Sequence, residues 1–312
     1  MATNPLFIFV AAVLPAFLLF AFIYWKDKYQ REPIGQLLLG FFFGILSCFL
    51  SLSISLPLKF LGFFPDEPTT IYGAIATAFF GAGIPEEGAK LLMLWLLVNR
   101  NKYFDEHFDG IVYAATIGLG FAAFENIFYL FSNIDTWQTV ATARAMFSVP
   151  GHFFFAVIMG YFFSLAYFGK GGWRQYARAF YLPVLLHTTY DALLFVYRVF
   201  ADNQAIQALL LMLFYVFFIK MWLQVRRRMS MHLDKDLQTL AEHDSFKVNL
   251  PENPAAPQPM PTSDSADITP SLDPSQDTHP TLKPVTYNEQ DYMPQPTDAV
   301  TNNPSTKLTD EE

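Results

Sequence analysis

Apolar residues along the first 225 positions form seven long runs separated by short polar stretches. A helix needs roughly 20 apolar residues to cross the hydrocarbon core of a bilayer, because each residue adds about 1.5 Å. Every run is near or above that length. The pattern therefore predicts seven transmembrane helices at Leu6–Trp25, Ile34–Pro57, Ile71–Val98, Asp109–Phe131, Arg144–Phe168, Tyr176–Phe200 and Gln204–Val225.

The first apolar run has the features of a retained span. The preceding residues, Met1-Ala2-Thr3-Asn4-Pro5, carry no basic side chain, and no convincing small-residue cleavage site follows. A secretory signal peptide normally has both. We therefore expect the run to stay in the protein.

The pattern changes after Arg228. Leucines recur at helical spacing from Leu233 to Leu240, which predicts a short polar helix over Met231–His243. From Pro251 onward, twelve prolines are mixed with Ser, Thr, Asp and Asn, and few large apolar side chains remain to offset the entropy of ordering. This region is predicted to be disordered.

Composition and charge support a membrane domain followed by a tail. The chain is 53% hydrophobic and only 15% charged, which is typical of membrane proteins. Residues 230–312 carry 15 acidic and 4 basic side chains, so this part has a charge of −11 and the remainder +3, which gives the total of −8. The predicted fold is an all-α polytopic membrane protein with a buried polar cluster at 1–229 and an acidic, Pro-rich tail at 230–312, which is mostly disordered.

Two classes of site are excluded by composition. No basic face with interleaved aromatic residues occurs outside the predicted spans, so nucleic acid is not an expected partner. Cys48 is the only cysteine and lies in an apolar run, so neither a disulfide framework nor a cysteine zinc site can form.

The distribution of Lys and Arg predicts the orientation. Alternate loops of a seven-span chain hold twelve basic residues on one side and three on the other, with Lys90 inside a span. Positive charge accumulates in cytoplasmic loops. We therefore expect the N-terminus outside and the C-terminus in the cytoplasm. The three basic residues on the outer side are Lys59, Arg144 and Arg198.

Three charged residues interrupt the third apolar run, at Glu86, Glu87 and Lys90. A carboxylate at bilayer depth costs about 3 kcal/mol or more, so intramembrane charges are rare and usually functional. Lys90 lies four residues after Glu86 and can pair with it on one helix face. Pro85 removes a backbone donor, so a kink or a helix start here would expose the pair to a cavity. A structural ion pair is the alternative, and the functional interpretation is favoured.

Later spans add polar residues at similar depth. Glu125 and Asn126 lie well inside the fourth span, after small residues that permit close helix packing, namely Gly118, Gly120, Ala122 and Ala123. The fifth span begins at Arg144 and contains His152 after Pro150-Gly151. In the sixth span His187 and Asp191 are four residues apart and share a face.

The rise per residue brings these groups to one zone. It places Glu125, His152, His187 and Asp191 roughly 10–17 Å from the outer surface, with Glu86 somewhat deeper. Four spans therefore direct ionisable groups toward one region of the bilayer.

Such a cluster is suited to hydrolysis or to proton transfer. A carboxylate within reach of water can act as a general base toward a carbonyl carbon, with Glu86 or Glu87 in that role. Two histidines and carboxylates can equally bind a divalent metal such as zinc, with His152, His187 and Asp191 as the candidate ligands. A proton-coupled transporter that uses the same Glu and His residues as a relay is the alternative. The absence of a detectable inverted repeat counts against it.

The ordered set of motifs resembles the PrsW family of intramembrane proteases. The matching motifs are Glu86-Glu87-x-x-Lys90, Asp109-Gly110 with Gly120-Phe121-Ala122-x-x-Glu125-Asn126, Arg144 before Pro150-Gly151-His152, and His187-x-x-x-Asp191. The resemblance spans roughly residues 10–225. PrsW proteins belong to a wider superfamily with the CAAX prenyl proteases and bacteriocin-immunity proteins.

The resemblance implies a multi-pass enzyme of the bacterial plasma membrane that cleaves a membrane-anchored protein. First-site cleavage of an anti-sigma factor during envelope stress is the activity typical of the family. The implied catalytic positions are Glu86, Glu87, Glu125, His152, His187 and Asp191, and Lys90, Asn126 and Arg144 are expected to support them. The family is usually called metalloprotease, whereas a glutamate mechanism is argued for relatives, so both mechanisms stay open here.

Overall fold

The computed structural model describes residues 4–27, 30–99, 101–169 and 171–248 of the 312-residue chain, with the backbone alone described at 243–248. All regular elements of this part are helical. They are α1 Pro5–Lys26, α2 Ile34–Phe60, α3 Ile71–Ala76, η1 Thr77–Gly83, α4 Ile84–Val98, α5 His107–Ser132, η2 Ile134–Thr136, α6 Trp137–Ala143, η3 Arg144–Ser148, α7 Val149–Tyr167, α8 Gly172–Val199 and α9 Gln204–Val248.

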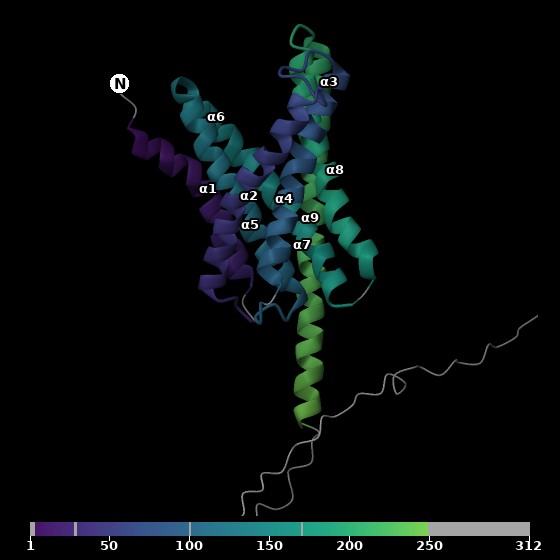
Figure 1. Ribbon diagram of the computed structural model, residues 1–312. Helices are drawn as coiled ribbons and strands as arrows, with labels where there is room; N and C mark the ends of the chain where they lie inside the picture. The colour runs from purple at the N-terminus through teal and green to yellow at the C-terminus, as the bar shows by residue number, and fades with distance from the viewer. Residues whose placement is uncertain (1–3, 28–29, 100, 170, 249–312) are drawn as a thin grey trace, which may run out of the picture. The chain divides into compact units, whose positions relative to one another are not determined.

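The helices form an up-and-down bundle (Figure 1). The chain passes along it seven times, because α3, η1 and α4 follow one another without a break, as do α6, η3 and α7. Six of these passes are long and apolar enough to cross a membrane. The remaining pass runs from Ile71 to Val98 and is divided by the η1 segment. The predicted all-α polytopic fold with about seven spans is confirmed.

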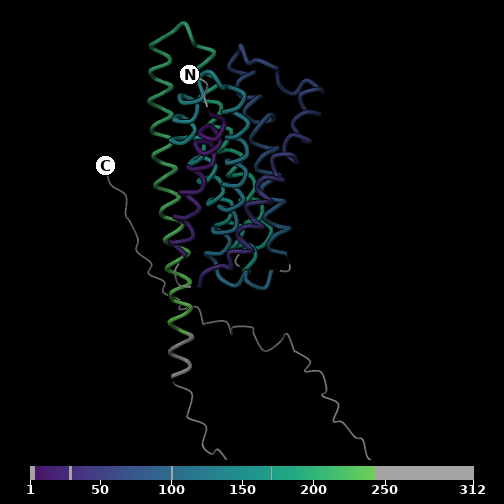
Figure 2. The backbone as a smooth tube through the Cα atoms, turned by 90° about the vertical axis from the view of Figure 1, so that its left-hand side faces the viewer, coloured from purple at the N-terminus to yellow at the C-terminus, as the bar shows by residue number. Residues whose placement is uncertain are grey.

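Two predicted boundaries differ from the structure by more than four residues. The fifth pass begins at Trp137 rather than at Arg144. The stretch before Arg144 mixes polar and apolar residues, and it is helical all the same. The last helix does not stop at Val225. α9 runs unbroken through the region expected to form a separate short helix, since no Gly or Pro interrupts 204–248 and the three arginines at 226–228 are good helix formers. Figure 2 shows α9 extending beyond the other helices. The predicted disordered region from Pro251 lies outside the described residues.

α5 is the central helix of the bundle, and it packs against α1, α2 and α7. Small residues allow these approaches. A Cβ on Gly120 would overlap the carbonyl oxygen of Phe41 in α2, and one on Gly160 in α7 would overlap the carbonyl oxygen of Gly110 in α5. The small-residue motif of α5 therefore lets neighbouring backbones touch, which is the usual role of glycine between membrane helices.

Polar contacts join α9 to the end of the bundle that is lower in Figure 1. The Asp236 carboxylate accepts the backbone N–H groups of His107 (3.1 Å) and Phe108 (2.8 Å), so a side chain of α9 caps the first turn of α5. His232 Nε2 lies 3.0 Å from the carbonyl oxygen of Tyr161 in α7. These contacts fix the lower part of α9 against the bundle.

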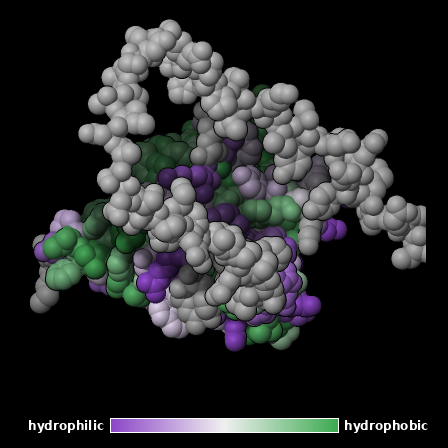
Figure 3. Space-filling view, turned by 90° about the horizontal axis from the view of Figure 1, so that it is seen from below, coloured by the Kyte–Doolittle hydropathy of each residue, from purple (hydrophilic) through white to green (hydrophobic). Residues whose placement is uncertain are grey.

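Carboxylates in the loops gather at the same end, which Figure 3 views from below with hydrophilic residues beside the hydrophobic helix sides. Asp27 accepts the backbone N–H of Glu32 (3.2 Å), and Tyr113 donates a short hydrogen bond to Glu32. Burial raises the pKa of Asp27 to about 6 and the pKa of Glu32 and of Glu106 to about 7. This end is therefore less charged near neutral pH than its sequence suggests.

The Gly120 contact can be tested by a pair of matched substitutions. Gly120→Ala should lower the thermal unfolding temperature of the purified protein in detergent, because the added methyl group must push α2 away from α5. Gly35→Ala is the control, since a Cβ at Gly35 meets nothing within 4 Å and alanine is favoured over glycine in a helix by about 1 kcal/mol. Equal unfolding temperatures for the two variants would contradict the packing described.

Candidate active site

The π-helical segment η1 leads directly into the Glu86-Glu87 motif. Pro85 has no backbone N–H and its ring would clash with the carbonyl four residues earlier in a regular α-helix. Widening the turn relieves this conflict, and the N–H of Ile84 bonds the carbonyl oxygen of Phe79, five residues back. The span therefore divides near Pro85, as its sequence predicts, but through a π-helical segment and not through unwound chain. π segments of this kind are frequent at functional sites.

The same device precedes the second proline motif. In η3 the N–H of Val149 bonds the carbonyl oxygen of Arg144, again five residues back, immediately before Pro150. α7 then carries His152 in its first turn. Two π segments thus set the start of the two helices that supply Glu86, Glu87 and His152.

Lys90 joins the polar groups of α4 to α7. Its ammonium lies 2.8 Å from Glu87 Oε1, 3.3 Å from Glu86 Oε2 and 3.1 Å from His152 Nδ1. The Phe121 ring of α5 lies below it, with the centroid 3.9 Å from Nζ. Lys90 and Glu87 are both fully buried, so this is a charge pair held away from water on every side.

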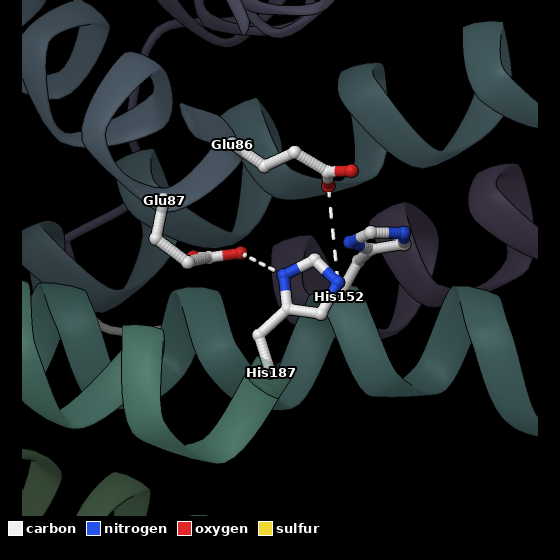
Figure 4. A group of neighbouring side chains, drawn as sticks. All are labelled: Glu86, Glu87, His152 and His187. Carbon is white, nitrogen blue, oxygen red and sulfur yellow. Dashed lines mark hydrogen bonds and ion pairs between the residues drawn. The ribbon is translucent and has the colours of Figure 1, made fainter. Parts of the chain in front are cut away.

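His187 brings α8 into the cluster, and Figure 4 shows its ring directed toward both glutamates. Nδ1 lies 2.8 Å from Glu87 Oε1, while Nε2 lies 3.9 Å from Glu86 Oε2 and 3.4 Å from Asp191 Oδ2. The ring stacks on Phe155 at a centroid distance of 4.8 Å. Both nitrogens and one face of the imidazole are therefore positioned by neighbours.

Arg144 links the polar residues of α5 to His152. Its guanidinium donates to Glu125 Oε2 (2.6 Å) and to Asn126 Oδ1 (2.5 Å), and Glu125 Oε2 also lies 2.9 Å from His152 Nε2. Asn126 in turn donates to the carbonyl oxygen of Ala12 in α1 (3.0 Å). Arg144 was predicted to open a span at the membrane surface, but it lies within the helix and is part of the buried cluster.

All nine residues singled out in the sequence thus lie in one connected network. Within the described residues, four of them bring one possible metal-ligating atom each to within 4.8 Å of one another: Glu86, Glu87, His152 and His187. Asp191, which was a candidate ligand, touches His187 but is not part of this group.

The aromatic side chains of the cluster were not predicted from the sequence. Phe121 under Lys90, Phe155 against His187 and Tyr129 under Arg144 (4.0 Å) each cover one side of an ionisable group. The chain contains 34 phenylalanines and 15 tyrosines, so composition alone does not distinguish these three. Two of them did offer one signal, because Phe121 and Tyr129 lie four residues before and after Glu125 on the same helix face.

Comparison with known proteins gives the family. Residues 32–222, which contain all nine of these positions, match the PrsW family of intramembrane metalloproteases. The chain belongs to this family.

Protease PrsW of Geobacillus kaustophilus is 39% identical over 186 residues, which is 59% of this chain and 78% of that protein. The Bacillus subtilis protein of the same name is 34% identical over 186 residues, covering 59% of this chain and 81% of its own length. That of Clostridioides difficile is 36% identical over 194 residues, or 61% and 79% of the two chains. No solved structure matches the chain.

The PrsW membership decides between the two functions that the cluster allowed. The protein is a multi-pass membrane protease, that is, a peptide hydrolase. A proton-coupled transporter is not favoured. Three carboxylate side chains of the cluster are partly exposed. Glu86 is 14% exposed, Asp191 18% and Glu125 20%, whereas Glu87 is completely covered. The three partly exposed carboxylates can therefore contact a molecule outside the cluster, whereas Glu87 cannot.

The buried pair of Lys90 and Glu87 should be essential for stability. Lys90→Met should lower the free energy of unfolding by about 3–5 kcal/mol, because it leaves a carboxylate buried without its cation. Adding Glu87→Gln should restore part of the loss. Chemical or thermal unfolding in detergent measures both.

Lys102→Met is the matched control, since Lys102 is exposed in the loop before α5. An equal loss of stability for Lys90→Met and Lys102→Met would show that the pair contributes no more than a surface lysine.

Proposed function

We propose that the protein hydrolyses a peptide bond of a membrane-anchored protein at the cluster formed by α4, α5, α7 and α8. One observation carries the proposal. Carboxylates and imidazoles from these helices converge on Lys90 and His187 inside an apolar bundle, with Glu86 at the accessible edge. A base beside groups that can stabilise charge is the minimum equipment for attack by water on a carbonyl carbon.

Glu86 is the better candidate for the base that receives a proton from water. Its carboxylate is partly exposed, and its contacts with Lys90 (3.3 Å) and His187 (3.9 Å) are longer than those of Glu87. Glu87 is held by Lys90 and by His187, each at 2.8 Å, and is fully buried. We infer that Glu87 orients its two partners, and that Glu86 reaches the water.

The two histidines are suited to holding protons on either side of Glu86. Glu87 fixes Nδ1 of His187, so Nε2 faces Glu86 and Asp191. His152 is fixed by Lys90 at Nδ1 and by Glu125 at Nε2. Arg144 balances the charge of Glu125 and holds it toward His152. Protonation of the leaving amine and stabilisation of the oxyanion would come from these imidazoles and from Lys90.

The residues also fit the metal that the family description implies. The donor set of two carboxylates and two imidazoles is one that zinc accepts. Glu87 Oε2 is buried and has no hydrogen-bond partner among the described residues. Glu86, Glu87, His152 and His187 would hold the ion, and a bound zinc would lower the pKa of its water.

Charge balance is compatible with a divalent metal and with protonated histidines. The cluster contains four carboxylates, Glu86, Glu87, Glu125 and Asp191, and two permanent cations, Lys90 and Arg144. Two negative charges are therefore left over, which equals the charge of one divalent cation. Protonation of both imidazoles would balance the cluster equally well.

The substrate class follows from the position of the cluster. A site enclosed by membrane helices is reached most directly by a chain that itself enters the bilayer, so the proposed substrate is a membrane-anchored protein. An anti-sigma factor cleaved first at this site during envelope stress is the specific candidate, and a bacterial plasma membrane is the proposed location.

Substitution of the two glutamates tests the hydrolytic mechanism. Glu86→Gln should reduce cleavage of a single-span substrate by about 10²-fold or more, because glutamine keeps the size but cannot take the proton. Glu87→Gln should also reduce cleavage. Reaction of purified protein in detergent, followed by gel analysis of products, measures the rates. Glu67→Gln is the control, since Glu67 is exposed in the loop between α2 and α3. Wild-type rates in both variants would exclude these roles.

Metal content distinguishes the metal-dependent from the metal-free mechanism. Elemental analysis of the purified wild-type protein should give close to one zinc or similar divalent ion per chain, and Glu86→Gln and His187→Asn should reduce that content. A wild-type protein that is active and holds no metal would favour the glutamate mechanism.

Orientation completes the proposal, with the N-terminus outside and the C-terminus in the cytoplasm. Because Arg144 lies in the buried cluster, only Lys59 and Arg198 remain of the three basic residues assigned to the outer side, against twelve on the other. The helix ends nearest Glu125 would then face outward.

A reporter that works only in the cytoplasm tests the orientation. Fused after Glu242, it should be active, because the excess of basic residues holds that end of α9 inside. A fusion of the same reporter in the 61–70 loop should be inactive. The reverse pattern with normal membrane insertion would invert the assignment.

A further inference from the structure

A second feature of the bundle lies where α7, α8 and α9 meet. Residues of α7, α8 and α9 line a partly open cavity of about 190 Å³. Its walls on α7 and α8 are entirely apolar, at Phe154, Ile158, Leu182 and Leu186. Apolar cavities stay dry, so the apolar part of this one is suited to an acyl chain.

The polar part of the lining belongs to α9 alone and carries only positive charge. Lys220, Gln224 and Arg228 follow one another at intervals of four residues, so they form one stripe along the cavity. Neither cation has a carboxylate partner among the described residues. The Arg228 guanidinium lies over the rings of Tyr161 (4.9 Å) and Phe162 (4.8 Å), and its Nε is buried without a hydrogen-bond partner in the described part of the chain.

The position of these cations along α9 indicates what they face. Lys220 and Arg228 lie 16 and 24 residues after Gln204, hence about 24 and 36 Å along the helix axis. The hydrocarbon core is about 30 Å thick, so Arg228 reaches the headgroup level of the lower leaflet. Lys220 lies just inside it and can extend toward the same level. The cavity thus has an apolar upper part and a cationic lower end.

We propose that this cavity binds one phospholipid with a negatively charged headgroup. An acyl chain would occupy the apolar part between Ile158, Leu182 and Leu186, and the headgroup phosphate would accept hydrogen bonds from Arg228 and Lys220. Basic pockets between membrane helices recognise anionic lipids through this combination. A zwitterionic lipid offers the same chains but less net charge. The lipid would fasten α9 to α8, the helix that carries His187.

Native mass spectrometry of the full-length protein tests the proposal. Protein purified in detergent is exposed to equal amounts of phosphatidylglycerol and phosphatidylcholine with identical acyl chains, and the retained lipids are counted. The wild-type protein should retain one phosphatidylglycerol. Arg228→Gln should lower that retention by about tenfold, because a charge-assisted hydrogen bond is lost. Arg227→Gln is the control, since Arg227 is the adjacent arginine, exposed and outside the cavity.

A second pair of variants tests the cavity without changing charge. Leu182→Trp should fill the apolar part and also abolish retention, whereas Leu185→Trp should not, because Leu185 is 52% exposed and lies outside the lining. If Leu182→Trp does not give a folded protein by circular dichroism, Leu182→Phe replaces it.

Three results would overturn the proposal. Equal retention of the two lipids would mean that the cations do not select the headgroup. Equal losses in Arg227→Gln and Arg228→Gln, with no effect of Leu182→Trp, would mean adsorption to a basic surface. A photoreactive residue at Leu182 that captures the single-span substrate in place of lipid would assign the cavity to a helix.

Discussion

The low polarity of the bilayer interior is the constraint on which the rest of this structure depends. Glu87 and Lys90 are fully buried, and neither charge is stable there alone. Lys90 contacts both glutamates of α4 and reaches His152 of α7, while His187 of α8 adds a second contact to Glu87 Oε1. The buried charges of α4 are therefore fully balanced only when α7 and α8 are in place. The same contacts that make the cluster tolerable in an apolar medium also fix the relative positions of the helices that carry it.

The packing of α5 makes this convergence possible. Gly120 allows the backbone of α2 to touch α5, and Gly110 and Gly160 allow α7 to do the same. Glu125 and Phe121 can then approach Lys90, His152 and their neighbours from a central position. Larger residues on α5 would separate the helices by more than a hydrogen bond can span. Close packing and charge neutralisation are therefore one requirement.

Much of this arrangement could be predicted from the sequence, because the hydrocarbon thickness sets span length and because charge is rare inside spans. Those two rules predicted the seven passes and brought His152 and His187 to a similar depth, with Glu86 somewhat deeper. Arg144 was placed at a helix start because the polar stretch before it ends the apolar run, yet a polar stretch can be helical.

Other features depend on three-dimensional contacts that periodicity does not encode. α9 continues past Arg228 because nothing in its sequence breaks a helix. Hydropathy predicts only where the helix leaves the hydrocarbon core, not where the helix ends. Phe121 and Phe155 gain their roles only when α5 and α7 meet Lys90 and His187. The group of four possible metal ligands likewise needed side-chain positions, since Asp191 and Glu86 are equally plausible in sequence.

The two π segments allow the part of each pass before the cluster to direct its side chains independently of the part that carries the cluster residues. In an α-helix each residue turns the chain by about 100°, so a residue inserted into a regular α-helix rotates everything that follows by that amount. A π turn takes up the additional residue in one wider turn, which avoids most of that rotation. Because η1 and η3 each lie just before a motif, the upper parts of these passes can turn to suit their own neighbours without dictating where Glu86 or His152 points. A one-residue insertion above the cluster can thus be absorbed locally, and the face that carries Glu86 or His152 keeps its direction.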